Sequence, residues 1–262
     1  MIEASTAEAG TSGRGADPVV NLTGEGRTWW DHLNRYSPNT VQRISGHVRA
    51  AIRNGAISTK MRELFYIGVD SVVTHLYPKG VALHAERAIE AGATTGEIIE
   101  VLQLACGASS RSYATAIGIV ADEIAAAGLD APVPAEDERV AAQAFKQQFI
   151  ESEGFWEPWM DFAIERVPTH FTAWLRMNYA PGEPRELEPK ARALISMALA
   201  VCAAMADEAG IRRHARLALR HGATAAEVYE AMQLATGLGP HAFSNAIPVL
   251  QPLFDDATPA AQ

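Results

Sequence analysis

The chain has 262 residues, of which 48% are hydrophobic and 20% are charged, and its formal net charge is −9. This composition is typical of a core-forming globular protein, and the acidic balance argues against a nucleic-acid partner because no basic cluster would neutralise phosphates. No run approaches the roughly 18 apolar residues needed to span a bilayer. Two cysteines cannot form a disulfide framework, so we expect a cytoplasmic protein.

Helical patterns separated by glycine and proline breaks follow one another along the first half. Residues 1–25 are rich in Gly, Ala, Ser and Thr and have no apolar signal segment, so we expect a disordered tail. Trp29 and Trp30 open a short helix. Further helices are predicted over residues 38–54, 60–76, 80–91, 95–105 and 109–126. Nothing in either half alternates with period two, so the predicted fold class is all-α.

The second half repeats the first. When the sequence is shifted by about 130 residues, residues 190–224 align with residues 60–94 without a gap. The predicted organisation is a first repeat over 26–128, a linker and connecting helix over 129–152, a second repeat over 153–255 and a disordered tail over 256–262. Two similar halves in one chain predict a duplicated structure.

His84 and His214 occupy the same place in the two repeats, each four residues after a glycine. A histidine in this position is suited to proton transfer to or from a carbon acid or a lactone. The alternative is a structural histidine, on the surface of its helix or buried. Duplication alone can also explain a residue that both halves share.

Other polar candidates belong mainly to the first repeat. Their counterparts in the second repeat are Ala193, Ala200, Met205 and Asp207, which replace Glu63, Asp70, His75 and Tyr77. Glu63 and Asp70 lie about two turns apart on nearly one face of the predicted helix, whereas His75 is rotated away from that face. Buried ionisable groups on an apolar helix are common at functional sites, but these carboxylates could also face solvent or pair with Lys60 and Arg62.

Two further sets of residues remain as alternatives. Glu63, His75 and His84 could supply a carboxylate and two imidazoles to Fe(II) or Zn, although their spacing matches no compact metal motif. Arg111 and His241 occupy equivalent positions before the last helix of each repeat. They are candidates for binding an anionic substrate, and a salt bridge or a solvated surface is the competing interpretation.

At these residues the chain resembles the carboxymuconolactone decarboxylase superfamily, which includes the alkylhydroperoxidase D-like proteins. In the first repeat the matching features are Lys60-x-Arg62-Glu63-Leu64, His84, the Gly-Ala-Thr at 92–94 and the EIIEVL that begins at Glu97. In the second repeat they are Lys190-x-Arg192-x-Leu194, His214, the Gly-Ala-Thr at 222–224 and the EVYE that begins at Glu227. The resemblance implies two alkylhydroperoxidase D-like helical repeats that form a pseudo-dimer.

The resemblance also implies a reaction. The peroxidase branch uses a Cys-x-x-Cys before the helix histidine, but Tyr77 and Gly80 stand there in this chain, so thiol peroxide reduction is excluded. The decarboxylase branch lacks the cysteines and uses the histidine as acid or base. It implies a cofactor-independent, metal-free lyase acting on a small carboxylated lactone or a related intermediate, by decarboxylation or isomerisation.

The resemblance and the residue pattern together lead us to expect the following roles for the candidate residues. His84 is the proton donor or acceptor, assisted by Glu63 and His75, while Tyr77 orients the substrate and His214 is a second site or a remnant. Asp70, Arg111 and His241 are the substrate-binding candidates. Family members assemble into rings, so we expect a homo-oligomer, a trimer of two-repeat chains. A non-catalytic binding or assembly protein remains the alternative from a different functional class.

Overall fold

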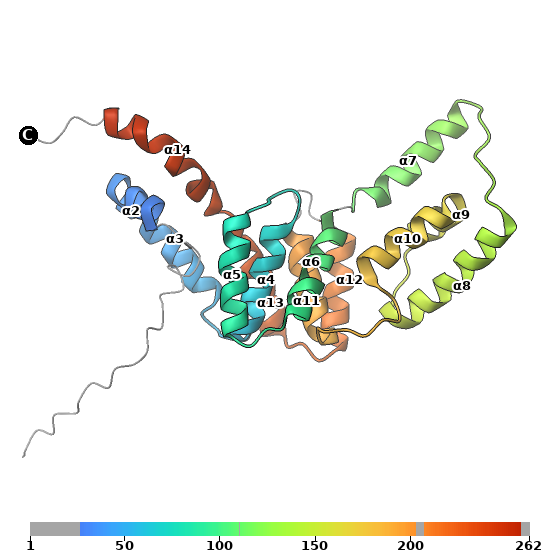
Figure 1. The fold of residues 1–262 in the computed structure, drawn as a ribbon, viewed down its shortest axis with the longest axis horizontal. Helices are drawn as coiled ribbons and strands as arrows, with labels where there is room; N and C mark the ends of the chain where they lie inside the picture. Colours follow the sequence, from blue (N-terminus) through green and yellow to red (C-terminus); the bar gives the residue numbers. More distant parts are fainter. Residues whose placement is uncertain (1–26, 110, 203–206, 258–262) are drawn as a thin grey trace, which may run out of the picture. The chain divides into compact units, whose positions relative to one another are not determined.

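A computed structural model describes residues 27–109, 111–202 and 207–257, and every regular element among them is helical (Figure 1). The helices are α2 (Arg27–Tyr36), α3 (Pro38–Ala51), α4 (Thr59–Ser71), α5 (Pro78–Glu90), α6 (Thr95–Ser109), α7 (Tyr113–Ala126), α8 (Glu136–Glu153), α9 (Pro158–Arg166), α10 (Pro168–Tyr179), α11 (Pro189–Cys202), α12 (Glu208–Arg220), α13 (Ala225–Ala235), the short 3-10 helix η1 (Thr236–Leu238) and α14 (His241–Ala257). The all-α prediction is confirmed. The predicted tail over 1–25 lies outside the described residues, and α14 extends two residues into the predicted tail over 256–262.

The chain forms two compact units whose limits differ from those of the predicted repeats. Of the described residues, one unit contains those up to Ala50 and those from Phe243 onward, and the other contains those from Ala51 to Ala242. In the first unit, Trp29, Leu33 and Ile247 form a small buried core. Each unit therefore draws on both halves of the sequence, and the repeat boundaries remain a prediction.

Helices α4 and α11, which correspond to each other in the two repeats, pack together at the centre of the second unit. A β-carbon added at Gly68 of α4 would lie 3.1 Å from Val101 on α6 and 3.3 Å from Leu199 on α11. Ile67 and Ile195 are fully buried beside this contact. Glycine thus allows a close approach of the two repeats, and every residue of α4 from Glu63 to Asp70 is buried.

Two buried carboxylates connect the repeats reciprocally. Glu100 of α6 accepts hydrogen bonds of 2.8 Å from the backbone N–H groups of residues 186–187, just before α11. Glu230 of α13, at the corresponding position, accepts hydrogen bonds of 2.7 and 3.3 Å from the backbone N–H groups of residues 56–57, before α4. Each repeat therefore satisfies backbone donors of the other, which fixes α4 and α11 in register.

A second cluster of buried side chains joins α8, α9 and α10. Phe149, Phe171 and Leu175 are fully buried there. The predicted connecting helix is α8, which begins one residue and ends two residues beyond the predicted limits near Asp137 and Glu151. Across the residues that the structure describes, no helix combines the length and the hydropathy that a membrane crossing needs.

Candidate active site

The turn after α4 places His75 over Asp70. The predicted helix over 60–76 is too long, because α4 ends at Ser71 and Val72 is extended. The Ser71 hydroxyl donates 2.6 Å to the carbonyl of Ile67, and such competition with the helix backbone weakens its last turn. The N–H of Tyr77 then returns to the carbonyl of Asp70 at 2.8 Å. His75 is therefore carried back toward the helix instead of being rotated away.

Glu63 and His84 form a buried pair between α4 and α5. Nδ1 of His84 lies 2.7 Å from Oε2 of Glu63, and the two residues are 1% and 3% exposed respectively. In the tautomer in which Nδ1 of His84 donates this hydrogen bond to the Glu63 carboxylate, Nε2 carries no proton and is left for other partners. The ring of Tyr66 stacks on His84 with centroids 4.7 Å apart. These contacts hold the imidazole in one orientation.

The carboxylate of Asp70 is fully buried and faces three imidazoles. Its Oδ1 lies 3.6 Å from Nε2 of His75 and 3.5 Å from Nδ1 of His241, and its Oδ2 lies 3.9 Å from Nε2 of His84. A β-carbon at position 80 would fall 2.0 Å from Oδ2, so Gly80 gives the carboxylate its room. The structure brings Glu63 and Asp70 together with His84, and it adds His75, which the sequence placed on a different face of the predicted helix.

His241 reaches this cluster from the other repeat. It begins α14, and its Nδ1 lies 2.8 Å from Nε2 of His75, while the ring of Tyr77 lies 4.3 Å from its own. Burial lowers the pKa of His241 to about 4, against the opposing effect of the Asp70 carboxylate, so the ring is neutral at pH 7. Two of the three proposed substrate-binding residues, Asp70 and His241, thus lie in contact in this cluster.

The third of these residues, Arg111, lies in the corresponding region of the second repeat. It forms an ion pair with Asp207, beside the buried His214. In this region Ala193 and Ala200 stand where Glu63 and Asp70 stand in the first repeat. Burial lowers the pKa of His214 well below its usual value, and the guanidinium groups of Arg213, Arg111 and Arg192 lower it further. His214 is thus a neutral imidazole, and among the residues that the structure describes no carboxylate pairs with it as Glu63 pairs with His84.

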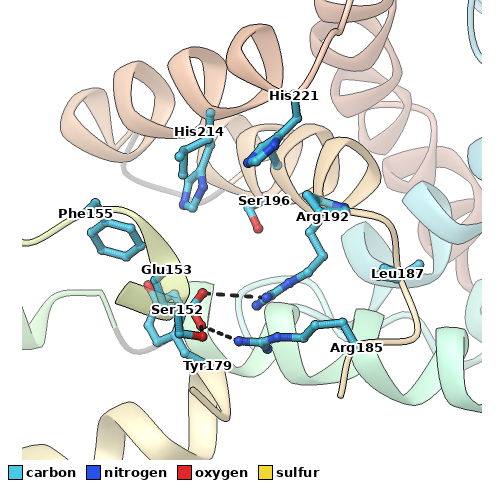
Figure 2. Close-up of a pocket in the computed structure, with 13 residues that line it drawn as sticks. Ser152, Glu153, Phe155, Tyr179, Arg185, Leu187, Arg192, Ser196, His214 and His221 are labelled. Atoms are coloured by element: carbon cyan, nitrogen blue, oxygen red, sulfur yellow. Dashed lines mark hydrogen bonds and ion pairs between the residues drawn. The ribbon is translucent and has the colours of Figure 1, made fainter. Parts of the chain in front are cut away.

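A cavity of about 160 Å³ opens beside His214 (Figure 2). Arg185 and Arg192 enter it and both pair with Glu153, whose pKa is raised by burial. Figure 2 shows His214 and Phe155 on the side of the cavity away from Arg185. Sequence reasoning did not select Glu153, because no motif surrounds it. Its partner Arg192 was the available signal, since Arg192 corresponds to Arg62 in the repeat.

A further cavity, of about 420 Å³, has Arg111, Asp207 and Arg213 in its wall together with aromatic side chains, among them Trp159 and Trp174. Sequence reasoning did not select the two tryptophans. Both pack, partly buried, against the core cluster of α8, α9 and α10, and only the folded structure places them on a cavity wall.

The alternative metal ligands expected from the sequence are not the ones that the structure gathers. Among the described residues, Glu63, His75 and His84 form no group whose ligand atoms all lie within 4.8 Å, because Glu63 is turned to Nδ1 of His84. Asp70, His75 and His241 do form such a group. The correction arises from the short α4 and from the second repeat, which supplies His241.

Comparison with known proteins supports the duplicated fold. The model of the carboxymuconolactone decarboxylase family matches residues 38–116 and again residues 168–251. The crystal structure of a "putative gamma-carboxymuconolactone decarboxylase subunit" from Burkholderia xenovorans LB400 superposes with a TM-score of 0.82 at 29% sequence identity, over 92% of this chain and 96% of that one. Comparison with curated proteins gives no significant match.

Proposed function

Because the chain belongs to the carboxymuconolactone decarboxylase family, we propose that it is a lyase that uses acid–base catalysis on a small carboxylated lactone or a related intermediate. The observation that carries this proposal is the buried pair of Glu63 and His84, joined at 2.7 Å. A carboxylate on one ring nitrogen orients an imidazole and leaves the other nitrogen for proton transfer.

The proposed reaction replaces a carboxylate on the substrate with a proton. When a β,γ-unsaturated or β-keto-like lactone loses carbon dioxide, the electron pair of the broken carbon–carbon bond passes into the conjugated carbonyl system. A proton must then be added to carbon, and we assign its delivery to Nε2 of His84. The imidazolium form of His84 would lie between two carboxylates, Glu63 at Nδ1 and Asp70 facing Nε2, which stabilise its charge. Such a reaction needs no cofactor, because the substrate is its own electron sink.

We assign the half-buried side chains of His75 and Tyr77 to the approach to this pair. His75 has a side chain 17% exposed and connects the buried carboxylate of Asp70 with solvent, so it can return a proton to the site. Tyr77, which lies against His241, is proposed to orient the substrate. For His214 we propose a second binding site, since a cavity opens beside it.

The test is to incubate the purified chain in D₂O with a panel of carboxylated unsaturated lactones and their methyl esters. Decarboxylation predicts release of one carbon dioxide and a product with one deuterium on carbon, and it predicts that the esters persist. A product that keeps its carboxylate but gains deuterium would replace the lyase with an isomerase. Saturable binding without turnover of any lactone would instead indicate a non-catalytic binding protein.

We also propose a trimer of two-repeat chains. The family resemblance supports it, and the similar chain from Burkholderia is described as a subunit. Light scattering coupled to gel filtration should then give three times the chain mass of 28.1 kDa. A monomeric mass would contradict this.

A further inference from the structure

The carboxylate of Asp70 lacks the partners that a buried charge needs. The residue is 0% exposed, and neither carboxylate oxygen accepts a hydrogen bond from any residue that the structure describes. An ionised carboxylate in such surroundings is costly unless a positive charge compensates it. Nε2 of His75 and Nδ1 of His241 face Oδ1 at 3.6 and 3.5 Å, which is too far for a short charge-assisted hydrogen bond. The cluster therefore calls for a cation.

We propose that Asp70, His75 and His241 bind one divalent transition-metal ion. Oδ1 of Asp70, Nε2 of His75 and Nδ1 of His241 form a triangle with sides of 3.6, 3.5 and 2.8 Å. Ligand atoms around a tetrahedral ion with bonds of about 2.1 Å lie about 3.4 Å apart. The two distances to the carboxylate fit this geometry, and the two imidazoles need to separate by only about 0.6 Å.

The ligand types indicate the class of ion. Two imidazoles and one carboxylate suit Zn²⁺, Fe²⁺ or Co²⁺, whereas Mg²⁺ and Ca²⁺ prefer oxygen ligands alone. A neutral imidazole is the form that binds a metal. His75 is the half-buried ligand and faces the route by which an ion and a solvent ligand would enter. Three protein ligands leave a further coordination position open.

The second repeat offers a natural comparison within the same chain. Ala200 replaces Asp70, and Arg111 stands at the position that corresponds to His241. There the guanidinium of Arg111 supplies a permanent positive charge and pairs with Asp207. We therefore expect one ion per chain, bound by the first-repeat cluster alone. This differs from the metal-free site expected from the sequence.

Metal binding to the full-length chain tests the proposal directly. The protein, freed of any histidine tag and treated with a chelator, is titrated with Co²⁺ while visible absorption is recorded, and with Zn²⁺ in competition with a chromophoric chelator. We expect one equivalent of each ion and intense visible bands typical of four- or five-coordinate Co²⁺. His75→Ala, His241→Ala and Asp70→Asn should each weaken binding by about 100-fold or more, because each removes a ligand. His170→Ala, which removes an exposed histidine on α10, should not change it.

Several outcomes would overturn the proposal. One is the absence of stoichiometric binding; another is binding that His75→Ala and His241→Ala leave unchanged. If Asp70→Asn fails to fold, as judged by circular dichroism, His75→Ala still decides, because its side chain lies on a turn and is partly exposed. The readout is metal binding, so the result is independent of whether the chain turns over a lactone.

Discussion

Nδ1 of His84 lies 2.7 Å from Oε2 of Glu63, and both side chains are buried between α4 and α5. The second repeat keeps the histidine as His214 but has Ala193 in place of the glutamate. One chain therefore contains the same helix histidine in two electrostatic settings. In the first repeat it lies among carboxylates, and in the second it lies among guanidinium groups.

The charge of Glu63 should matter more to turnover than its hydrogen bond. Glu63→Gln keeps an oxygen that can accept from Nδ1 of His84 but removes the negative charge that stabilises the imidazolium, so we expect kcat to fall about 10- to 100-fold. Glu97→Gln is the matched control, because Glu97 is also buried but pairs with Lys60 away from the histidine. Equal kcat values for the two variants, measured with the same lactone, would argue against a catalytic role for the Glu63 charge.

Alanine at position 80 should destabilise the chain. The added methyl group would lie 2.0 Å from Oδ2 of Asp70 and 2.5 Å from the ring of Tyr77, and overpacking of this kind costs about 1–3 kcal/mol. Gly118→Ala is the control, because a methyl group there meets nothing within 4 Å and alanine favours the helix by up to about 1 kcal/mol. Urea unfolding should place the two variants on opposite sides of the wild type. A Gly80→Ala chain as stable as Gly118→Ala would refute the close approach of α5 to Asp70.

The two reciprocal glutamates should differ in their contribution to stability. Glu230→Ala leaves two backbone N–H groups of residues 56–57 without their acceptor, at about 1–3 kcal/mol. Glu100→Ala has the same effect on residues 186–187 and also removes a partner 3.0 Å from the largely buried Arg192. We therefore expect the larger loss in unfolding free energy for Glu100→Ala. The reverse order in urea unfolding would show that the ion pair adds nothing.

Acid should destabilise the chain through His214. Burial and three arginines lower its pKa in the folded state, so below about pH 6.5 the unfolded chain binds a proton that the folded chain does not. The free energy of unfolding should then decrease as the pH falls, by up to about 1.4 kcal/mol per pH unit for this one group. His214→Gln should have a shallower slope between pH 6.5 and 5, measured by urea unfolding. An unchanged slope would show that His214 is protonated in the folded chain.

The sequence predicted the helices, the duplication and the meeting of Glu63 with His84, because these depend on local periodicity and on a family pattern. It did not predict the position of His75, because the end of α4 at Ser71 is not marked by glycine or proline. The prediction extended the helix to the next visible break, at Pro78. A serine hydroxyl that competes for a helix carbonyl is a weak signal in sequence.

The contribution of His241 could not be read from the sequence either. It lies 166 residues from His75 and meets it only because the two repeats pack with α4 against α11. The same packing carries Arg111 of the first repeat to His214 of the second. Periodicity within one helix gives no information on such pairings, which depend on how two amphipathic surfaces combine. The repeat therefore predicted equivalent residues but not which of the two sites each would join.

The most direct measurement of the central claim is kcat for His84→Asn, with the lactone that the wild-type chain consumes most rapidly. The account predicts a fall of about 100- to 10,000-fold, since a positioned acid or base contributes that much, with an unchanged circular dichroism spectrum. His170→Asn, at an exposed site on α10, should keep the wild-type value. A His84→Asn chain that is folded and retains kcat within twofold would contradict the account, and a matching loss in His214→Asn would move the reaction to the second repeat.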